Sequence, residues 1–92
     1  MPESPRTILI VDDEASQRTL LSGFVESIGF RPAEAPSAEE ALASIRRACP
    51  AMVLLDVRLP GMNGIEALAK IREISSELPV LLITAHADLR QA

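Results

Sequence analysis

The chain has little aromatic character and no basic excess. It contains no tryptophan, no tyrosine and only two phenylalanines, so it offers no stacking platform for nucleic-acid bases. Its formal net charge is −4, which leaves no positive stripe to bind a phosphate backbone. We therefore expect no direct nucleic-acid binding by this segment. A cation or a basic partner surface is the better match for an acidic chain.

Disulfides and membrane spans are not expected either. Cys49 is the only cysteine and cannot form an internal disulfide, and its place before Pro50 favours a small packed residue over a redox centre. No signal peptide opens the chain, and no apolar run approaches the ~18 residues that a membrane span needs. We expect a cytoplasmic protein without membrane contact. Its 92 residues, 48% of them hydrophobic, have room for one core and one domain.

Apolar runs of strand length alternate with helical patterns along the chain, and this alternation predicts an α/β fold with a parallel sheet. The expected strands lie at residues 7–11, 31–35, 51–55 and 79–84. The expected helices run over about 15–28, after Ser37, and from about Asn63. The apolar face of the first helix is Leu20, Leu21, Phe24, Val25 and Ile28. The buried face of the second is Ala41, Leu42, Ile45 and Ala48.

The expected helix ends carry local signals. Gly29 stands where a left-handed residue ends the first helix. Ser37 with Glu40, and Asn63 with Glu66, have the spacing of capping boxes. In that motif the N-cap side chain accepts from the amide three residues on, and the acid reaches back to the N-cap amide.

The strand sequences predict the order of the sheet. The second strand is polar and contains Pro32, which suits an edge. The other three are nearly continuous valine, isoleucine and leucine, as in strands covered on both faces. Right-handed crossovers then give the order 2-1-3-4, with the winding reversing between strands one and three, where ligands bind beyond the carboxyl ends. Strand four would be an unusually apolar edge.

Acidic residues close two of the apolar strands. Asp12, Asp13 and Glu14 follow the first strand, and Asp56 follows the third. Such a cluster binds a hard divalent cation or holds a reactive aspartate. Two structural interpretations stay open for the residues taken alone. The first three acids suit the positive end of the first helix, and Asp56 suits the start of a turn at Pro60.

Three segments in the same order resemble the receiver domain of bacterial two-component response regulators. They are ILIVDDE at 8–14, LLDVRLPGMNG at 54–64 and VLLITA at 80–85. The resemblance covers nearly the whole chain. Residues 83–88 are most similar to receivers of sigma-54-dependent activators.

The resemblance implies a role for each matching residue. Asp56 would be the phosphoacceptor, taking a phosphoryl group from a histidine kinase or a histidine phosphotransfer protein. Asp13 would bind Mg²⁺ directly, and Asp12 would bind it directly or through water. The backbone carbonyl of Arg58 would supply a further ligand. Thr84 would turn its hydroxyl toward the phosphoryl group as the switch, and the output would lie outside this chain.

The chain also departs from the family pattern. The resemblance implies a flavodoxin-like doubly wound sheet of order 2-1-3-4-5, but strand five, the last helix and the lysine after strand five have no counterpart. Lys70, the only lysine, lies in the third expected helix. We therefore expect a truncated receiver domain over residues 1–92, with self-association through the exposed edge of strand four and impaired phosphorylation.

Two other functional classes match the sequence less well than a receiver domain does. A phosphatase of the haloacid dehalogenase type resembles a strand that ends in Asp-x-Asp, whereas this chain has Asp12 next to Asp13. A flavodoxin-like nucleotide or flavin binder needs a loop rich in Gly, Ser or Thr after strand one, where this chain is acidic. We do not expect an enzyme. A receiver fold that acts only in protein interaction stays open as the alternative.

Overall fold

The computed structural model describes residues 6–59 and 61–83. It contains four strands, β1 Thr7–Val11, β2 Arg31–Ala35, β3 Met52–Asp56 and β4 Val80–Ile83. Three helices connect them, α1 Ala15–Ser27, α2 Ala38–Arg47 and α3 Gly64–Ile74. The boundaries lie close to those that the sequence predicts. None of the helices in the described ranges is long and apolar enough to cross a membrane.

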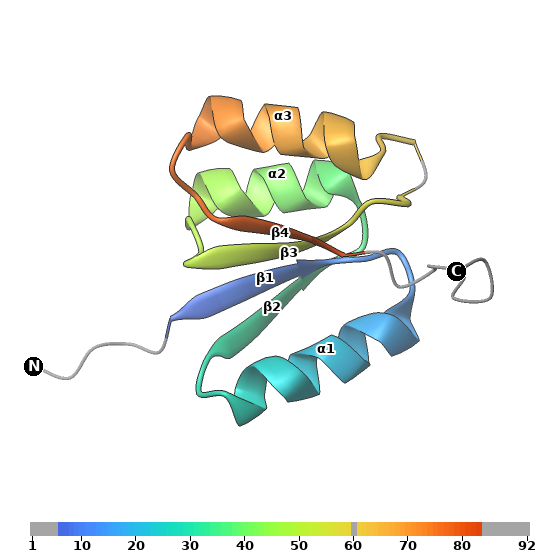
Figure 1. Ribbon diagram of the computed structural model, residues 1–92, viewed down its shortest axis with the longest axis vertical. Helices are drawn as coiled ribbons and strands as arrows, with labels where there is room; N and C mark the ends of the chain where they lie inside the picture. The colour runs from blue at the N-terminus through green and yellow to red at the C-terminus, as the bar shows by residue number, and fades with distance from the viewer. Residues whose placement is uncertain (1–5, 60, 84–92) are drawn as a thin grey trace, which may run out of the picture.

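The strands form one parallel sheet in the order β2-β1-β3-β4, as the sequence predicts. Helix α1 covers one face of the sheet, and α2 and α3 cover the other (Figure 1). The winding reverses between β1 and β3, which are neighbours in the sheet. The carboxyl ends of these two strands therefore meet at one edge, where a doubly wound sheet binds its ligands.

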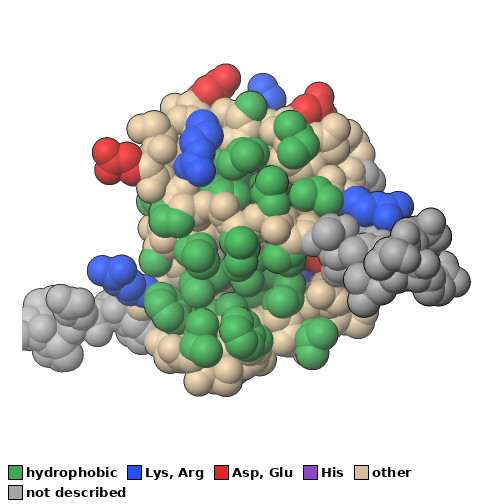
Figure 2. All heavy atoms as spheres, viewed as in Figure 1, with side chains coloured by type: hydrophobic (Ala, Val, Ile, Leu, Met, Phe, Trp, Pro, Cys, Tyr) green, Lys and Arg blue, Asp and Glu red, His purple; other side chains and the backbone are tan. Residues whose placement is uncertain are grey.

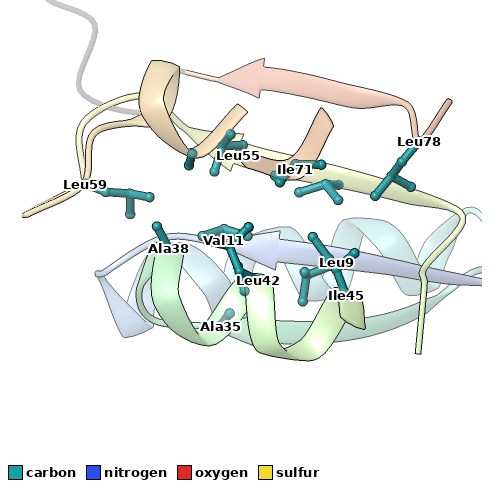
Figure 3. Close-up of a cluster of buried hydrophobic side chains, with 13 residues drawn as sticks. Leu9, Val11, Ala35, Ala38, Leu42, Ile45, Leu55, Leu59, Ile71 and Leu78 are labelled. Atoms are coloured by element: carbon teal, nitrogen blue, oxygen red, sulfur yellow. The ribbon is translucent and has the colours of Figure 1, made fainter. Parts of the chain in front are cut away.

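The core has two parts, one on each face of the sheet. The larger cluster lies between the sheet and helices α2 and α3, and includes Leu9 and Val11 of β1 (Figure 3). The smaller cluster lies toward α1 and includes Ile8 and Ile10 of the same strand. Successive side chains of a strand point to opposite faces, so one apolar strand supplies both clusters. This explains the continuous apolar sequence of β1.

The helix ends follow their local signals. Asn63 forms a complete capping box: its side chain accepts from the Glu66 amide at 2.9 Å, and its own amide donates to Glu66 Oε1 at 3.2 Å. Ser37 Oγ accepts from the Glu40 amide at 3.2 Å, but no hydrogen bond between described residues returns from Glu40. Gly29 has a φ of 92°, the left-handed conformation that ends α1.

Two expected helix faces need correction. Ala48 was predicted to be buried, but it is exposed because α2 ends at Arg47 and Ala48 has an extended backbone. Cys49, which was predicted to be a small packed residue, follows the end of α2 and is exposed as well. On α1, Val25 is buried, whereas Leu20 and Phe24 are 67% and 58% exposed. Only part of the apolar face of α1 is therefore covered by the described residues.

Strand β4 forms one edge of the sheet. It pairs with β3, and no other described strand pairs with it. Leu81 and Leu82 are 51% and 37% exposed. The predicted apolar edge is thus present among the described residues.

Candidate metal centre at the carboxyl ends of β1 and β3

The fold brings three predicted site residues together. The register pairs Val11 with Leu55, so the residues that follow them, Asp12 and Asp56, lie at the same edge of the sheet. Asp13 comes next on the loop between β1 and α1. One carboxylate oxygen from each of the three aspartates lies within 4.8 Å of the others. Two strands far apart in sequence thus build one acidic cluster, Asp12, Asp13 and Asp56, which we call the aspartate cluster.

The three aspartates differ in exposure and support. Asp12 and Asp56 are fully buried, whereas Asp13 is exposed. Asp12 Oδ1 accepts a hydrogen bond from the Glu14 amide at 3.0 Å, and Asp56 Oδ1 accepts one from the Arg58 amide at 2.9 Å. Each buried carboxylate is therefore oriented by the amide two residues further on, as in an Asx-turn.

Asp12 has an unsatisfied acceptor inside the cluster. Its Oδ2 is buried and accepts no hydrogen bond in the described part of the chain. Burial raises the pKa of Asp12, and the negative charges of Asp56, Asp13 and Glu14 raise it further against the opposing hydrogen bond from the Glu14 amide. A cation at this point would satisfy the oxygen and offset the repulsion.

The donor set fits a hard divalent cation. All three groups offer carboxylate oxygen, which Mg²⁺ prefers, and Mg²⁺ usually keeps several waters beside one or two carboxylates. The exposed position of Asp13 leaves that side of the cluster open to solvent. The aspartate cluster therefore has the chemistry of a magnesium site, with Asp12, Asp13 and Asp56 as the residues that would hold the ion.

Gly64 supports the loop that follows Asp56. Its amide donates to the Val57 carbonyl at 3.1 Å, which joins the start of α3 to this loop. A Cβ at this position would lie 2.5 Å from Val57 Cα and 2.9 Å from the Asp56 carbonyl oxygen. Only glycine allows this approach of helix and strand end. The sequence marks Gly64 as part of a helix start, but the contact depends on tertiary packing.

The other predicted site residues are placed less completely. The amide of Arg58 bonds to Asp56, while coordination of a metal by the Arg58 carbonyl stays a prediction. Thr84, the predicted switch, lies outside the described residues.

Comparison with known proteins identifies the family. The model of the response regulator receiver domain matches residues 8–92. The chain belongs to the response regulator receiver domain family, as the three sequence segments predict.

Relatives and solved structures agree with this assignment. The chain is 33% identical over 86 residues to the C4-dicarboxylate transport transcriptional regulatory protein DctD of Rhizobium meliloti, covering 94% of this chain and 19% of DctD. It is 37% identical over 82 residues to sporulation initiation phosphotransferase F of Bacillus subtilis, covering 89% of this chain and 66% of the relative. The chain thus spans about a fifth of the regulator and about two thirds of the phosphotransferase.

Similar solved structures are receiver domains or contain one. The N-terminal domain of a response regulator receiver protein from Methanoculleus marisnigri has a TM-score of 0.84 at 36% identity, covering 92% of this chain and 71% of that one. NtrX from Brucella abortus has a TM-score of 0.83 at 35% identity, covering 97% of this chain and 20% of NtrX. Relatives such as DctD and NtrX are regulators of the sigma-54-dependent type, which confirms the finer resemblance.

Proposed function

We propose that Asp56 accepts a phosphoryl group from the phosphohistidine of a histidine kinase or a histidine phosphotransfer protein. The observation that carries the proposal is the convergence of the Asp12, Asp13 and Asp56 carboxylates within 4.8 Å at the carboxyl edge of the sheet. Membership of the receiver family supports it. All 92 residues form one domain in this proposal, which acts in the cytoplasm as a signalling domain and not as an enzyme.

The transfer is a substitution at phosphorus. A carboxylate oxygen of Asp56 attacks the phosphorus atom of phosphohistidine, so that a P–O bond forms as the P–N bond breaks. The imidazole leaves with the electron pair of the broken bond and takes a proton from water. The product is an acyl phosphate on Asp56. Mg²⁺, when bound, neutralises the charge of the acceptor carboxylate and of the phosphoryl oxygens.

Different residues of the chain have different roles in this proposal. Asp12 and Asp13 would supply negatively charged oxygen to the cation, Asp12 from a buried position and Asp13 from the surface. The amide of Arg58 orients the Asp56 carboxylate through a 2.9 Å hydrogen bond. The Arg58 carbonyl is a further proposed ligand, and Thr84 is the proposed switch that passes the signal to an output outside this chain.

A titration followed by backbone NMR tests the proposal. Mg²⁺ is added first, and then beryllofluoride, which mimics a phosphoryl group on the acceptor carboxylate. We expect saturable shifts at the amides of Asp12, Asp13 and Asp56 with Mg²⁺, and a second change with beryllofluoride. Asp56→Asn should abolish the second change. The absence of saturable shifts in the unsubstituted chain would contradict the proposal.

A second function, self-association as an interaction module, is favoured by the exposed apolar surface. Leu81 and Leu82 of β4 are exposed, and so are Leu20, Phe24 and Ile28 at α1. Figure 2 shows hydrophobic side chains gathered across the middle of one face of the molecule. Apolar strand edges readily pair with another chain, and patches of this kind mark interaction sites. We propose that two copies pair through their β4 edges.

Sedimentation velocity over a range of concentrations tests the pairing. We expect a dimer or higher oligomer that Leu82→Lys converts to a monomer. Ile65→Lys is the matched control, because Ile65 is also a large exposed apolar residue, 62% exposed, but lies on α3. A compact monomer of the unsubstituted chain at high concentration would contradict this second function.

A further inference from the structure

Arg18 of α1 connects three segments beneath the aspartate cluster. Its Nη1 donates to the main-chain carbonyl of Asp12 at 2.6 Å. Its Nε donates to Glu34 Oε1 of β2 at 3.0 Å. The other oxygen of Glu34 accepts from Ser22 Oγ, also on α1, at 3.0 Å. The Arg18 side chain is 17% exposed, whereas that of Glu34 is 43% exposed, and the bond from Arg18 to the Asp12 carbonyl is partly buried.

The Asp12 backbone is held from both sides. Its amide donates to the Ala35 carbonyl of β2 at 3.1 Å, and its carbonyl accepts from Arg18. That carbonyl belongs to the planar peptide that leads into Asp13. The exposed carboxylate of Asp13 makes no hydrogen bond within the described residues, so its position depends on its backbone. The hydrogen bond from Arg18 holds the peptide group on which the position of the Asp13 carboxylate depends.

We propose that Arg18 is a positioning residue for the cation site. Its guanidinium, oriented by Glu34, holds the peptide between Asp12 and Asp13 so that their carboxylates meet Asp56. This inference rests on the proposed function of the aspartate cluster as a magnesium site. Arginine suits the role because its planar group presents donors in two fixed directions, one to a carbonyl and one to a carboxylate.

Charge and position have opposite effects on Mg²⁺ binding, which makes the proposal testable. Arg18 is a positive charge near a cation site, so its charge alone weakens Mg²⁺ binding. A positioning role strengthens Mg²⁺ binding. Arg18→Lys keeps the charge but loses the planar pair of donors, so any weakening of Mg²⁺ binding in this variant reports on position.

The experiment compares Arg18→Lys with a matched control, Arg72→Lys. Arg72 also donates from Nη1 to a main-chain carbonyl, that of Leu78, which precedes β4 at the opposite end of the strands. The Mg²⁺ dissociation constant is measured by calorimetry, and hydrogen exchange at the Asp13 and Glu14 amides is measured without metal. We expect Arg18→Lys to raise the dissociation constant about tenfold, as for residues that orient metal ligands, and to speed exchange at both amides. Arg72→Lys should change neither.

The outcomes separate this inference from the proposed function. Unchanged or tighter Mg²⁺ binding in Arg18→Lys, with unchanged amide exchange, would overturn the positioning role. If the unsubstituted chain binds no Mg²⁺, the proposed function fails. In that case the amide exchange still tests the positioning role. Faster exchange at Asp13 and Glu14 in Arg18→Lys, but not in Arg72→Lys, would support the ordering of the loop by Arg18. Exchange rates equal to those of the unsubstituted chain would refute it. If Arg18→Lys does not fold, Glu34→Gln takes its place, with faster Asp13 exchange as the deciding result.

Discussion

The two faces of the sheet are closed to different degrees. Toward α2 and α3, the buried cluster draws on both helices, three strands and the loop residues Leu59 and Leu78. Toward α1, the buried residues are Ile8, Ile10, Val25 and Leu54. The difference shows that the described residues complete the core on one face only, while α1 keeps much of its apolar side exposed.

This asymmetry matters because two residues of the aspartate cluster, Asp12 and Asp13, lie in the segment that leads from β1 into α1. A helix with few buried apolar contacts depends more on polar contacts for its position. Here Arg18 and Ser22 of α1 bond to Glu34 of β2, and Arg18 also bonds to Asp12. The α2 and α3 face therefore supplies most of the apolar stabilisation, and the α1 face supplies polar contacts to β2 and to the Asp12 backbone.

Truncation of one leucine on each face gives the largest expected effect. Leu55→Ala, in the cluster beside α2 and α3, should lower the free energy of unfolding by about 3 kcal/mol, because it leaves a cavity around a fully buried position. Leu20→Ala on α1 should change it by less than about 0.5 kcal/mol, since Leu20 is 67% exposed. Urea denaturation measures both. Similar losses for the two variants would contradict the asymmetry.

Alanine substitutions at two glycines, one at α3 and one in α1, should change the free energy of unfolding in opposite directions. Gly64→Ala should destabilise the chain by about 2 kcal/mol, because the new Cβ meets Val57 Cα at 2.5 Å. Gly23→Ala, inside α1, should stabilise it by about 0.5 to 1 kcal/mol, since a Cβ there meets nothing within 4 Å and alanine favours the helix. Thermal and urea denaturation give both values. A loss of stability in Gly23→Ala would show that α1 is more closely covered than the described residues indicate.

Much of the fold could be predicted from local patterns. The strand order followed from the polar second strand and the apolar others, and the cap at Asn63 followed from the spacing to Glu66. These features are set by residues near in sequence or by rules of sheet winding. The burial of α1 could not be predicted in the same way, because periodicity marks an apolar face without showing whether anything covers it.

In the candidate site, too, some features could be predicted from the sequence and others could not. Asp12, Asp13 and Asp56 could be predicted because each follows an apolar strand, and parallel strands end at a common edge. The contacts that support them could not. The bond from Arg18 to the Asp12 carbonyl depends on how α1 packs against β2, and the approach at Gly64 depends on how α3 begins. An arginine on a helix gives no sequence signal that separates such a contact from an ordinary exposed charge.

The remaining prediction concerns Asp12, the buried carboxylate that follows β1 in the aspartate cluster. Asp12→Asn removes a buried negative charge from the aspartate cluster while keeping its shape. Without metal, we expect the variant to be more stable than the unsubstituted chain at neutral pH by on the order of 1 kcal/mol. Saturating Mg²⁺ should reverse the order, because only the unsubstituted chain keeps the full set of carboxylates. Asp13→Asn is the control, and its metal-free effect should be smaller because Asp13 is exposed.

The pH dependence of this difference identifies its cause. Burial raises the pKa of Asp12 above its ordinary value of 3.8, so the folded chain holds the proton more tightly than the unfolded chain does. The free energy of unfolding of the metal-free chain should therefore lose the Asp12 contribution as the pH rises from 3.8 through the raised value. Asp12→Asn lacks this loss, so its advantage should grow across that window and then stay level. An advantage independent of pH would assign the effect to altered packing, and the charge of Asp12 would then not be what the cation offsets.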